Sequence, residues 1–306
     1  MTKATVGLAV VLALGCRSRP QSVVPASLPV DWQPYRWVTL DIGRETVRRA
    51  ALVVETHDPA LIRGSGGDSA ATRMQLDFGF AGTERFGIPL RTLVPSAPAA
   101  DSLRVLHGRI TGLGIRDDSI GVTKSYPLGT VGLLFYGIKG LIIDQVEHRI
   151  GAPRTGARLP PELTDRMQWT QATEEVGRLA VPLVWQGDRL GRLWYDPGSS
   201  LVPLLLDGPT WRLVTGRQGG EPDNQRLVFP AGGDSLVLIG APTTEPLVLG
   251  GIGLGRVTAW RVLANPAGLG ADRFDDGVVG QVGNQLFERF RMLYVNVRAK
   301  QLGVIP

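Results

Sequence analysis

Three aspartates in this sequence end a strand-like apolar segment and have a glycine two positions later. At Asp41-Ile42-Gly43 no second apolar strand follows at the right place, so we interpret it as a plain turn and consider the other two. The first is Asp77-Phe78-Gly79, and the second is Asp196-Pro197-Gly198, which Ser199 follows. The amides of such a turn, and a hydroxyl such as that of Ser199, can hydrogen-bond the carboxylate and hold it in place for proton transfer. Asp-Pro-Gly is also a common surface turn, so a single copy favours a plain turn and the second copy favours chemistry.

Each aspartate is also followed by a later apolar segment that ends in glycine. In the first half of the chain this segment is Thr130-Val131-Gly132, and in the second half it is Gln281-Val282-Gly283. The strand-like segments 73–77 and 190–195 lead into the aspartates. The same order twice along the chain indicates an internal repeat, with a longer insertion in the second copy.

The composition predicts an all-β protein. Glycine and proline are abundant among the 306 residues, at 40 and 22, while charged residues are sparse at 20%. That profile is typical of many short strands joined by turns. The length fits one large domain or two of ordinary size. The net charge is +5, but the basic residues are scattered without a basic run, which argues against nucleic acid as a partner.

The sequence predicts neither a metal nor a cofactor. His57, His107 and His148 are far apart and lack a neighbouring cysteine or paired carboxylates, so no zinc site is expected. The glycine-rich segment 250–255 resembles a nucleotide-binding loop only faintly. No helical pattern follows it, so a β turn is the better interpretation.

The N-terminus has the pattern of an export signal. Lys3 precedes an uncharged apolar run over 4–14, which is short for a membrane span. The run ends at Cys16, the only cysteine, and resembles a bacterial lipobox, although an ordinary secretory signal is the alternative. We predict a signal peptide over 1–15, lipidation of Cys16 and a flexible tether over 16–30. By the same resemblance, Arg17 in place of aspartate implies export across the inner membrane and anchoring at the outer membrane or cell surface.

Taken together, the motifs resemble the aspartic-protease superfamily over nearly all of the mature chain. In that family each lobe supplies a strand ending in Asp-Thr/Ser-Gly and a later apolar-apolar-Gly segment behind it, as at Gly132 and Gly283. The C-terminal stretch 282–306 is similar to the end of a pepsin-type lobe, and 129–151 to the end of a retropepsin-type unit. The hairpin with His107 and Gly108 is similar in position to the flap.

The resemblance implies a fold of two similar β-barrel-like lobes of the pepsin and retropepsin type, with a cleft between them. The N-terminal lobe would span 31–150 and the C-terminal lobe 179–306, with 151–178 as the connection. A peptide or unfolded protein would bind in the cleft.

The resemblance also implies a catalytic pair, Asp77 and Asp196. Two adjacent carboxylates cannot both ionise, so they share a proton, and one activates a water while the other protonates the carbonyl under attack. By the same resemblance, the amides of Gly79 and Gly198 would orient the carboxylates, and Ser199 would bond to Asp196.

The chain departs from the family pattern at the residue after each aspartate. The family has a threonine or serine there, whose hydroxyl locks the pair, whereas this chain has Phe78 and Pro197. A displacement of about 1 Å can cost on the order of a hundredfold in rate. Two hypotheses therefore stay open: a peptidase that hydrolyses peptide bonds, and a weak or inactive homologue that binds peptides or envelope components.

Overall fold

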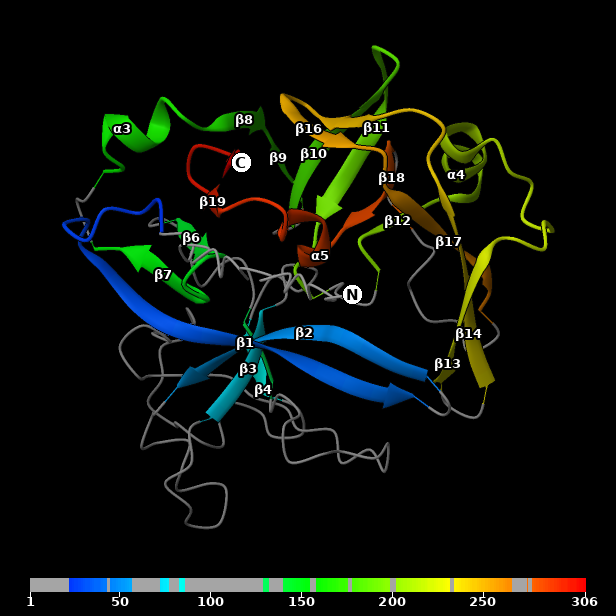
Figure 1. The fold of residues 1–306 in the computed structure, drawn as a ribbon, viewed down its shortest axis with the longest axis horizontal. Helices are drawn as coiled ribbons and strands as arrows, with labels where there is room; N and C mark the ends of the chain where they lie inside the picture. The colour runs from blue at the N-terminus through cyan, green and yellow to red at the C-terminus, as the bar shows by residue number, and fades with distance from the viewer. Residues whose placement is uncertain are drawn as a thin grey trace, which may run out of the picture.

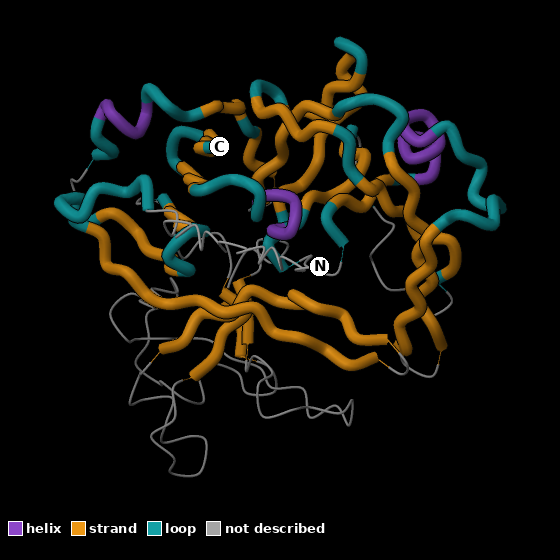
Figure 2. Tube along the Cα trace, viewed as in Figure 1, coloured by secondary structure: helices purple, strands orange, loops and turns teal. Residues whose placement is uncertain are grey.

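The computed structural model describes most of the second half of the chain and parts of the first half. The described residues are 22–42, 45–56, 72–76, 83–85, 129–131, 140–154, 158–175, 178–198, 202–231, 234–265, 274 and 277–306. Strands dominate these ranges and the helices are short, so the prediction of a β protein is confirmed (Figure 2). None of the helices in these ranges is long and apolar enough to cross a membrane.

The first sheet joins strands from both ends of the chain. Its ten strands follow the order β4-β5-β3-β2-β1-β7-β6-β19-β20-β8. Their bounds are β1 Val30–Ile42, β2 Glu45–Thr56, β3 Thr72–Leu76, β4 Thr83–Arg85, β5 Gly129–Val131, β6 Leu141–Asp144, β7 Arg149–Pro153, β8 Gln168–Gln171, β19 Met292–Asn296 and β20 Gln301–Ile305. The short helix α3 (Pro161–Thr164) lies between β7 and β8.

The last strands of the chain complete this first sheet. β19 pairs with β6 in antiparallel register, with Leu293 opposite Ile143, and β20 then pairs with β8. β19 and β20 fall within 179–306, the range predicted for the C-terminal lobe, and β8 falls within the predicted connection 151–178. The strands of the first sheet are therefore drawn from all three predicted segments.

The second sheet is built from residues 173–282. Its main order is β13-β14-β17-β12-β18-β11-β10-β15-β16, and β9 pairs with β10. Figure 1 shows these strands on one side of the molecule, with β6, β7, β8 and β19 on the other. The bounds are β9 Thr173–Glu175, β10 Arg178–Trp185, β11 Asp188–Tyr195, β12 Leu204–Leu206, β13 Gln225–Ala231, β14 Asp234–Pro242, β15 Leu247–Leu249, β16 Ile252–Gly255, β17 Thr258–Ala264 and β18 Val278–Val282, with helices α4 (Gly208–Thr215) and α5 (Asn284–Phe287).

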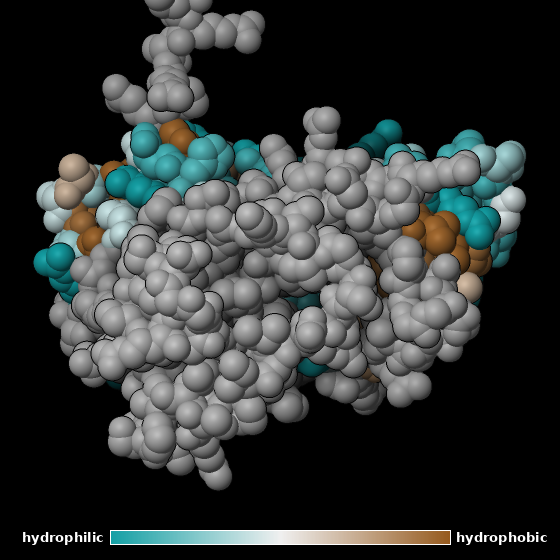
Figure 3. Space-filling model, turned by 90° about the horizontal axis from the view of Figure 1, so that it is seen from below, coloured by the Kyte–Doolittle hydropathy of each residue, from teal (hydrophilic) through white to brown (hydrophobic). Residues whose placement is uncertain are grey.

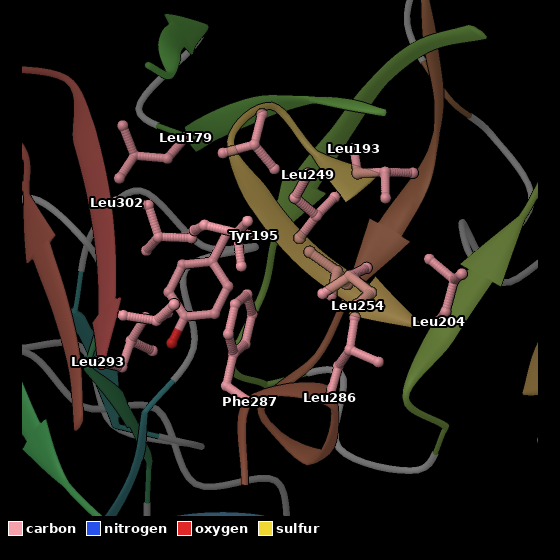
Figure 4. Packing of buried hydrophobic residues seen from close by; sticks show 14 of the residues in the cluster. Leu179, Leu193, Tyr195, Leu204, Leu249, Leu254, Leu286, Phe287, Leu293 and Leu302 are labelled. Carbon is pink, nitrogen blue, oxygen red and sulfur yellow. The ribbon is translucent and has the colours of Figure 1, made fainter. Parts of the chain in front are cut away.

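One continuous apolar core joins the two sheets. Leu293 and Leu302 of the first sheet and Tyr195 of the second belong to the same buried cluster, as Figure 4 shows. The Tyr195 ring meets Phe287 edge to face, with centroids 5.3 Å apart. Each large apolar side chain in such a core contributes about 1.5–3 kcal/mol relative to exposure. The burial of side chains from both sheets thus holds the strand ends that carry the candidate site.

A second contact between the sheets depends on two glycines in the β15–β16 turn. A Cβ at Gly250 would lie 1.9 Å from Thr170 Oγ1, and a Cβ at Gly251 would lie 2.3 Å from the carbonyl oxygen of Trp169. Both partners are on β8, so only glycine permits this approach of the turn to the first sheet. The interpretation of 250–255 as a β turn is confirmed, because the segment forms the turn and second strand of a hairpin.

Replacing Gly251 by alanine should destabilise the protein by about 1–3 kcal/mol, since the added methyl must displace the backbone of β8. The matched control is Gly253→Ala in the same hairpin, where a Cβ would meet nothing within 4 Å. We expect that control to change the free energy of unfolding by less than about 0.5 kcal/mol. Urea denaturation measures the free energy of unfolding of both variants. An equal loss of stability in the two would contradict the close contact at Gly251.

The chain before β1 is packed against the first sheet. Val24 and Leu28 are buried in a cluster with Ile142 and Ile305, and the Ser22 hydroxyl donates to Asp144 Oδ2 at 2.5 Å. The flexible tether predicted over 16–30 therefore does not include 22–30; residues 16–21 lie outside the described ranges. The prediction was wrong there because it relied on the serines and prolines of the segment, whereas the side chains of Val24, Leu28 and Val30 and the Ser22 hydroxyl pack against the sheet.

Candidate functional site

The Asp196 turn is formed around an inserted strand. β11 ends at Tyr195, directly before Asp196, and β18 lies beside it in parallel register with Val282 opposite Tyr195. On its other side β18 pairs with β12, the strand that follows the turn, with Leu204 opposite Val282. The Asp196 amide donates to the Val282 carbonyl at 2.9 Å. The backbone around Asp196 is thus fixed by the strand inserted between β11 and β12.

The first half of the chain has the same arrangement. β5 lies between β3 and β4, with Val131 parallel to Leu76 and antiparallel to Thr83. Leu76 directly precedes Asp77, as Tyr195 precedes Asp196. In both halves, the residue before the aspartate pairs with the residue before the glycine of the later segment.

The carboxylate of Asp196 accepts a hydrogen bond from the backbone of its own turn. The Gly198 amide donates to Asp196 Oδ1 at 2.9 Å. Pro197 is buried, while Asp196 and Gly198 are half-buried. A charge-assisted hydrogen bond of this kind holds one carboxylate oxygen in place and so restricts rotation of the Asp196 side chain.

Asn284 holds both residues that flank Asp196. Its side chain is fully buried at the start of α5, directly after Gly283. Its Oδ1 accepts from the Tyr195 hydroxyl at 2.8 Å, and its Nδ2 donates to the Pro197 carbonyl across a longer 3.4 Å. Asn284 was not among the site residues predicted from the sequence. A signal for its role was present in the sequence, because Asn284 is a polar residue next to the glycine that ends an apolar strand. A polar side chain buried at such a place needs hydrogen-bond partners.

The Tyr195 hydroxyl remains protonated over a wide pH range. Burial raises its pKa well above the usual value, and the negative charge of Asp196 raises it further, with a smaller contribution from Tyr35. A protonated phenol can donate to Asn284, whereas a phenolate could not. The bond between Tyr195 and Asn284 is therefore stable across neutral pH.

Replacing Tyr195 by phenylalanine should lower the free energy of unfolding near neutral pH by about 1–3 kcal/mol, because Asn284 Oδ1 loses its donor. The pKa of Tyr195 is raised in the native state and is about 10 in the unfolded chain. Its contribution to stability is therefore fully present below pH 10 and is lost as the pH rises toward the native pKa.

Urea denaturation as a function of pH tests this prediction. The stability of the wild-type protein should fall more steeply above about pH 10 than that of Tyr195→Phe, so the gap between them narrows. A gap that stays constant from neutral to strongly alkaline pH would contradict the raised pKa.

Of the predicted site residues, the structure places Asp196, Gly198 and Gly283 together at the end of β11. Among the residues described, no group of three histidine, cysteine or acidic side chains is arranged to hold a metal. The remaining predicted residues lie outside the described ranges, namely Cys16, Asp77, Gly79, His107, Gly108, Gly132 and Ser199.

The chain is similar to solved structures of other proteins, one of which is a globulin from soybean. The crystal structure of basic 7S globulin from soybean is similar with a TM-score of 0.45 and 8% sequence identity, over 91% of this chain and 95% of the globulin chain. No family model matches this sequence, and no curated protein matches it. A likeness at this level assigns neither a family nor an activity to the chain.

Proposed function

We propose that the protein is an aspartic-peptidase-like envelope lipoprotein with two similar lobes of the pepsin and retropepsin type. Asp77 and Asp196 act as one catalytic pair on a peptide or unfolded protein bound between the lobes. The proposed reaction is the hydrolysis of peptide bonds by an activated water.

The observation that carries this proposal is the repeated strand insertion. Tyr195 and Val282 pair in parallel beside the Asp196 turn, and Leu76 and Val131 pair in parallel directly before Asp77. Each inserted strand also pairs antiparallel with the strand after the turn. Two carboxylates presented by the same local structure are what a reaction with paired acid and base groups requires.

The apolar core gives a second, independent support. Leu76 and Tyr195, the residues directly before the two aspartates, are both fully buried and belong to the same continuous cluster. The two strands therefore end with side chains buried in one core. This placement favours a short distance between the carboxylates that follow them.

The chemistry follows from the electrostatics of such a pair. Close carboxylates share a proton, and the protonation state belongs to the pair rather than to either residue. The ionised member removes a proton from water, and the protonated member donates to the carbonyl oxygen of the peptide bond. The Gly198 amide, already bonded to Asp196 Oδ1, keeps that carboxylate oriented while its charge changes.

Replacing either Asp77 or Asp196 by asparagine should reduce cleavage of an unfolded protein by about a hundredfold to ten-thousandfold, the usual contribution of acid–base groups. The two losses should be similar, because the residues act as a unit. A statine-type inhibitor should block the wild-type protein at acidic to neutral pH, since it mimics the transition state.

The matched control is Asp188→Asn, at the exposed turn that begins β11. It changes one carboxylate on the same hairpin and should leave cleavage unaltered. Cleavage that survives both Asp77→Asn and Asp196→Asn would overturn the assignment of the pair.

A specific observation favours a second candidate, a catalytically inactive module that binds peptides. Pro197 is buried and supplies neither a hydroxyl nor an N–H at the position where the family pattern has a hydroxyl. If the purified protein cleaves nothing, introducing threonine at both Phe78 and Pro197 distinguishes the two. Gain of cleavage favours an intact but unlocked pair, and continued inactivity with measurable peptide binding favours the module.

The proposed membrane anchor is a lipid on Cys16. Replacing Cys16 by serine should abolish metabolic lipid labelling and move the protein from the membrane fraction to the soluble fraction, since the sequence offers no other cysteine. Absence of labelling in the wild-type protein would rule out the anchor.

A further inference from the structure

The described part of the chain begins with a segment that is fixed to the first sheet. Asp144 is fully buried, and its Oδ2 accepts from the Ser22 hydroxyl at 2.5 Å and from Arg149 Nε at 3.0 Å. Its Oδ1 accepts from two backbone amides, those of Val146 and Glu147, each at 3.2 Å. A buried carboxylate satisfied in this way would be left short of a donor if Ser22 moved away, so Ser22 is a firm point of attachment.

Apolar packing strengthens this attachment. Val24 is 5% exposed and Leu28 is 8% exposed, and both contact the cluster that contains Met292 and Ile305. Burial of two such side chains contributes about 1.5–3 kcal/mol each. We refer to residues 22–30 as the N-terminal strap.

The chain between the proposed anchor and the strap is short. Only residues 17–21 separate Cys16 from Ser22. Even a fully extended chain covers at most about 3.3–3.6 Å per residue, which limits the distance from Cys16 to Ser22 to about 20 Å. A globular chain of this length has a radius of gyration of about 19 Å and is therefore roughly 50 Å across.

We infer that the end of the molecule carrying the N-terminal strap is held against the lipid headgroups of the anchoring membrane. The inference rests on the proposed lipid at Cys16. The strap enters beside β7 and α3 at one end of the longest axis, whereas the loop after α4 lies at the other end (Figure 1). With a link of about 20 Å, the strap end cannot be the end that points away from the membrane while the strap stays attached.

The charged side chains around α3 add little to this orientation. Arg158 and Arg166 are exposed on either side of α3, but the exposed Glu162 and Asp165 between them offset their charge. Attraction to anionic lipid is worth about 1 kcal/mol for each unopposed basic residue, so the covalent link dominates.

The competing surface is at the opposite end. Leu213, Val228 and Leu263, from α4, β13 and β17, are the exposed large apolar side chains among the described residues. Hydrophobic side chains are visible toward that edge in Figure 3. If this end contacted lipid instead, the loop after α4 would lie closer to the membrane than the N-terminal strap.

Energy transfer to labelled lipid tests the inference in the full-length lipidated protein. Ser27→Cys places a thiol at an exposed position of the strap, and Gly220→Cys places one in the loop after α4, where a Cβ meets nothing within 4 Å. Lipidation consumes the Cys16 thiol, so each engineered thiol is the only one free to take a fluorescent donor. The vesicles contain phosphatidylethanolamine, phosphatidylglycerol and an acceptor-labelled phospholipid.

We expect a larger loss of donor fluorescence at position 27 than at position 220. Inserting about ten glycine and serine residues between Pro20 and Gln21 should reduce that difference, because a flexible linker of that length lets the body move away. An equal or larger loss at position 220 in lipidated protein overturns the inference. If Cys16 of the wild-type protein reacts with a thiol label, it carries no lipid, and both the anchor and the inference are overturned. That result distinguishes failure of the anchor from failure of the orientation alone.

Discussion

The insertion of β18 between β11 and β12 is the constraint on which the candidate site depends. β18 is in such close contact with β12 that a Cβ at Gly280 would lie 2.1 Å from the carbonyl oxygen of Leu205. A strand hydrogen-bonded on both sides cannot slip in register without exposing its buried face. The register fixes Val282 opposite Tyr195, and thereby fixes the turn that begins at Asp196 and the position of Asn284 behind it.

The turn that follows Asp196 combines two sources of rigidity. Pro197 restricts its own φ angle, and Asn284 bonds its carbonyl as well as the Tyr195 hydroxyl. These contacts come from the turn itself and from α5, which directly follows β18. The backbone around Asp196 is thus held by contacts close to it along β11, β18 and α5. Any alignment of Asp196 with Asp77 would depend on the core between the sheets.

The sequence was informative where the signal is local. Apolar segments ending in aspartate or glycine predicted the strand ends at Tyr195 and Val282, and the glycine-rich segment 250–255 was correctly interpreted as a turn. The entry of β19 and β20 into the first sheet could not be predicted, because the pattern of a strand does not specify its partner. Asn284 was missed for a similar reason: its partner Tyr195 is 89 positions away along the chain.

Closure of the first sheet by the last strands has a consequence for biosynthesis. β6 ends at Asp144, but its partner β19 begins at Met292. Ribosomes add about 5–20 residues per second, so β6 waits roughly 7–30 s for that partner. During this interval an apolar strand edge is open to pairing with other chains. Long-range pairing of this kind also slows folding. The first sheet therefore cannot be completed at β6 until the final residues of the chain are available.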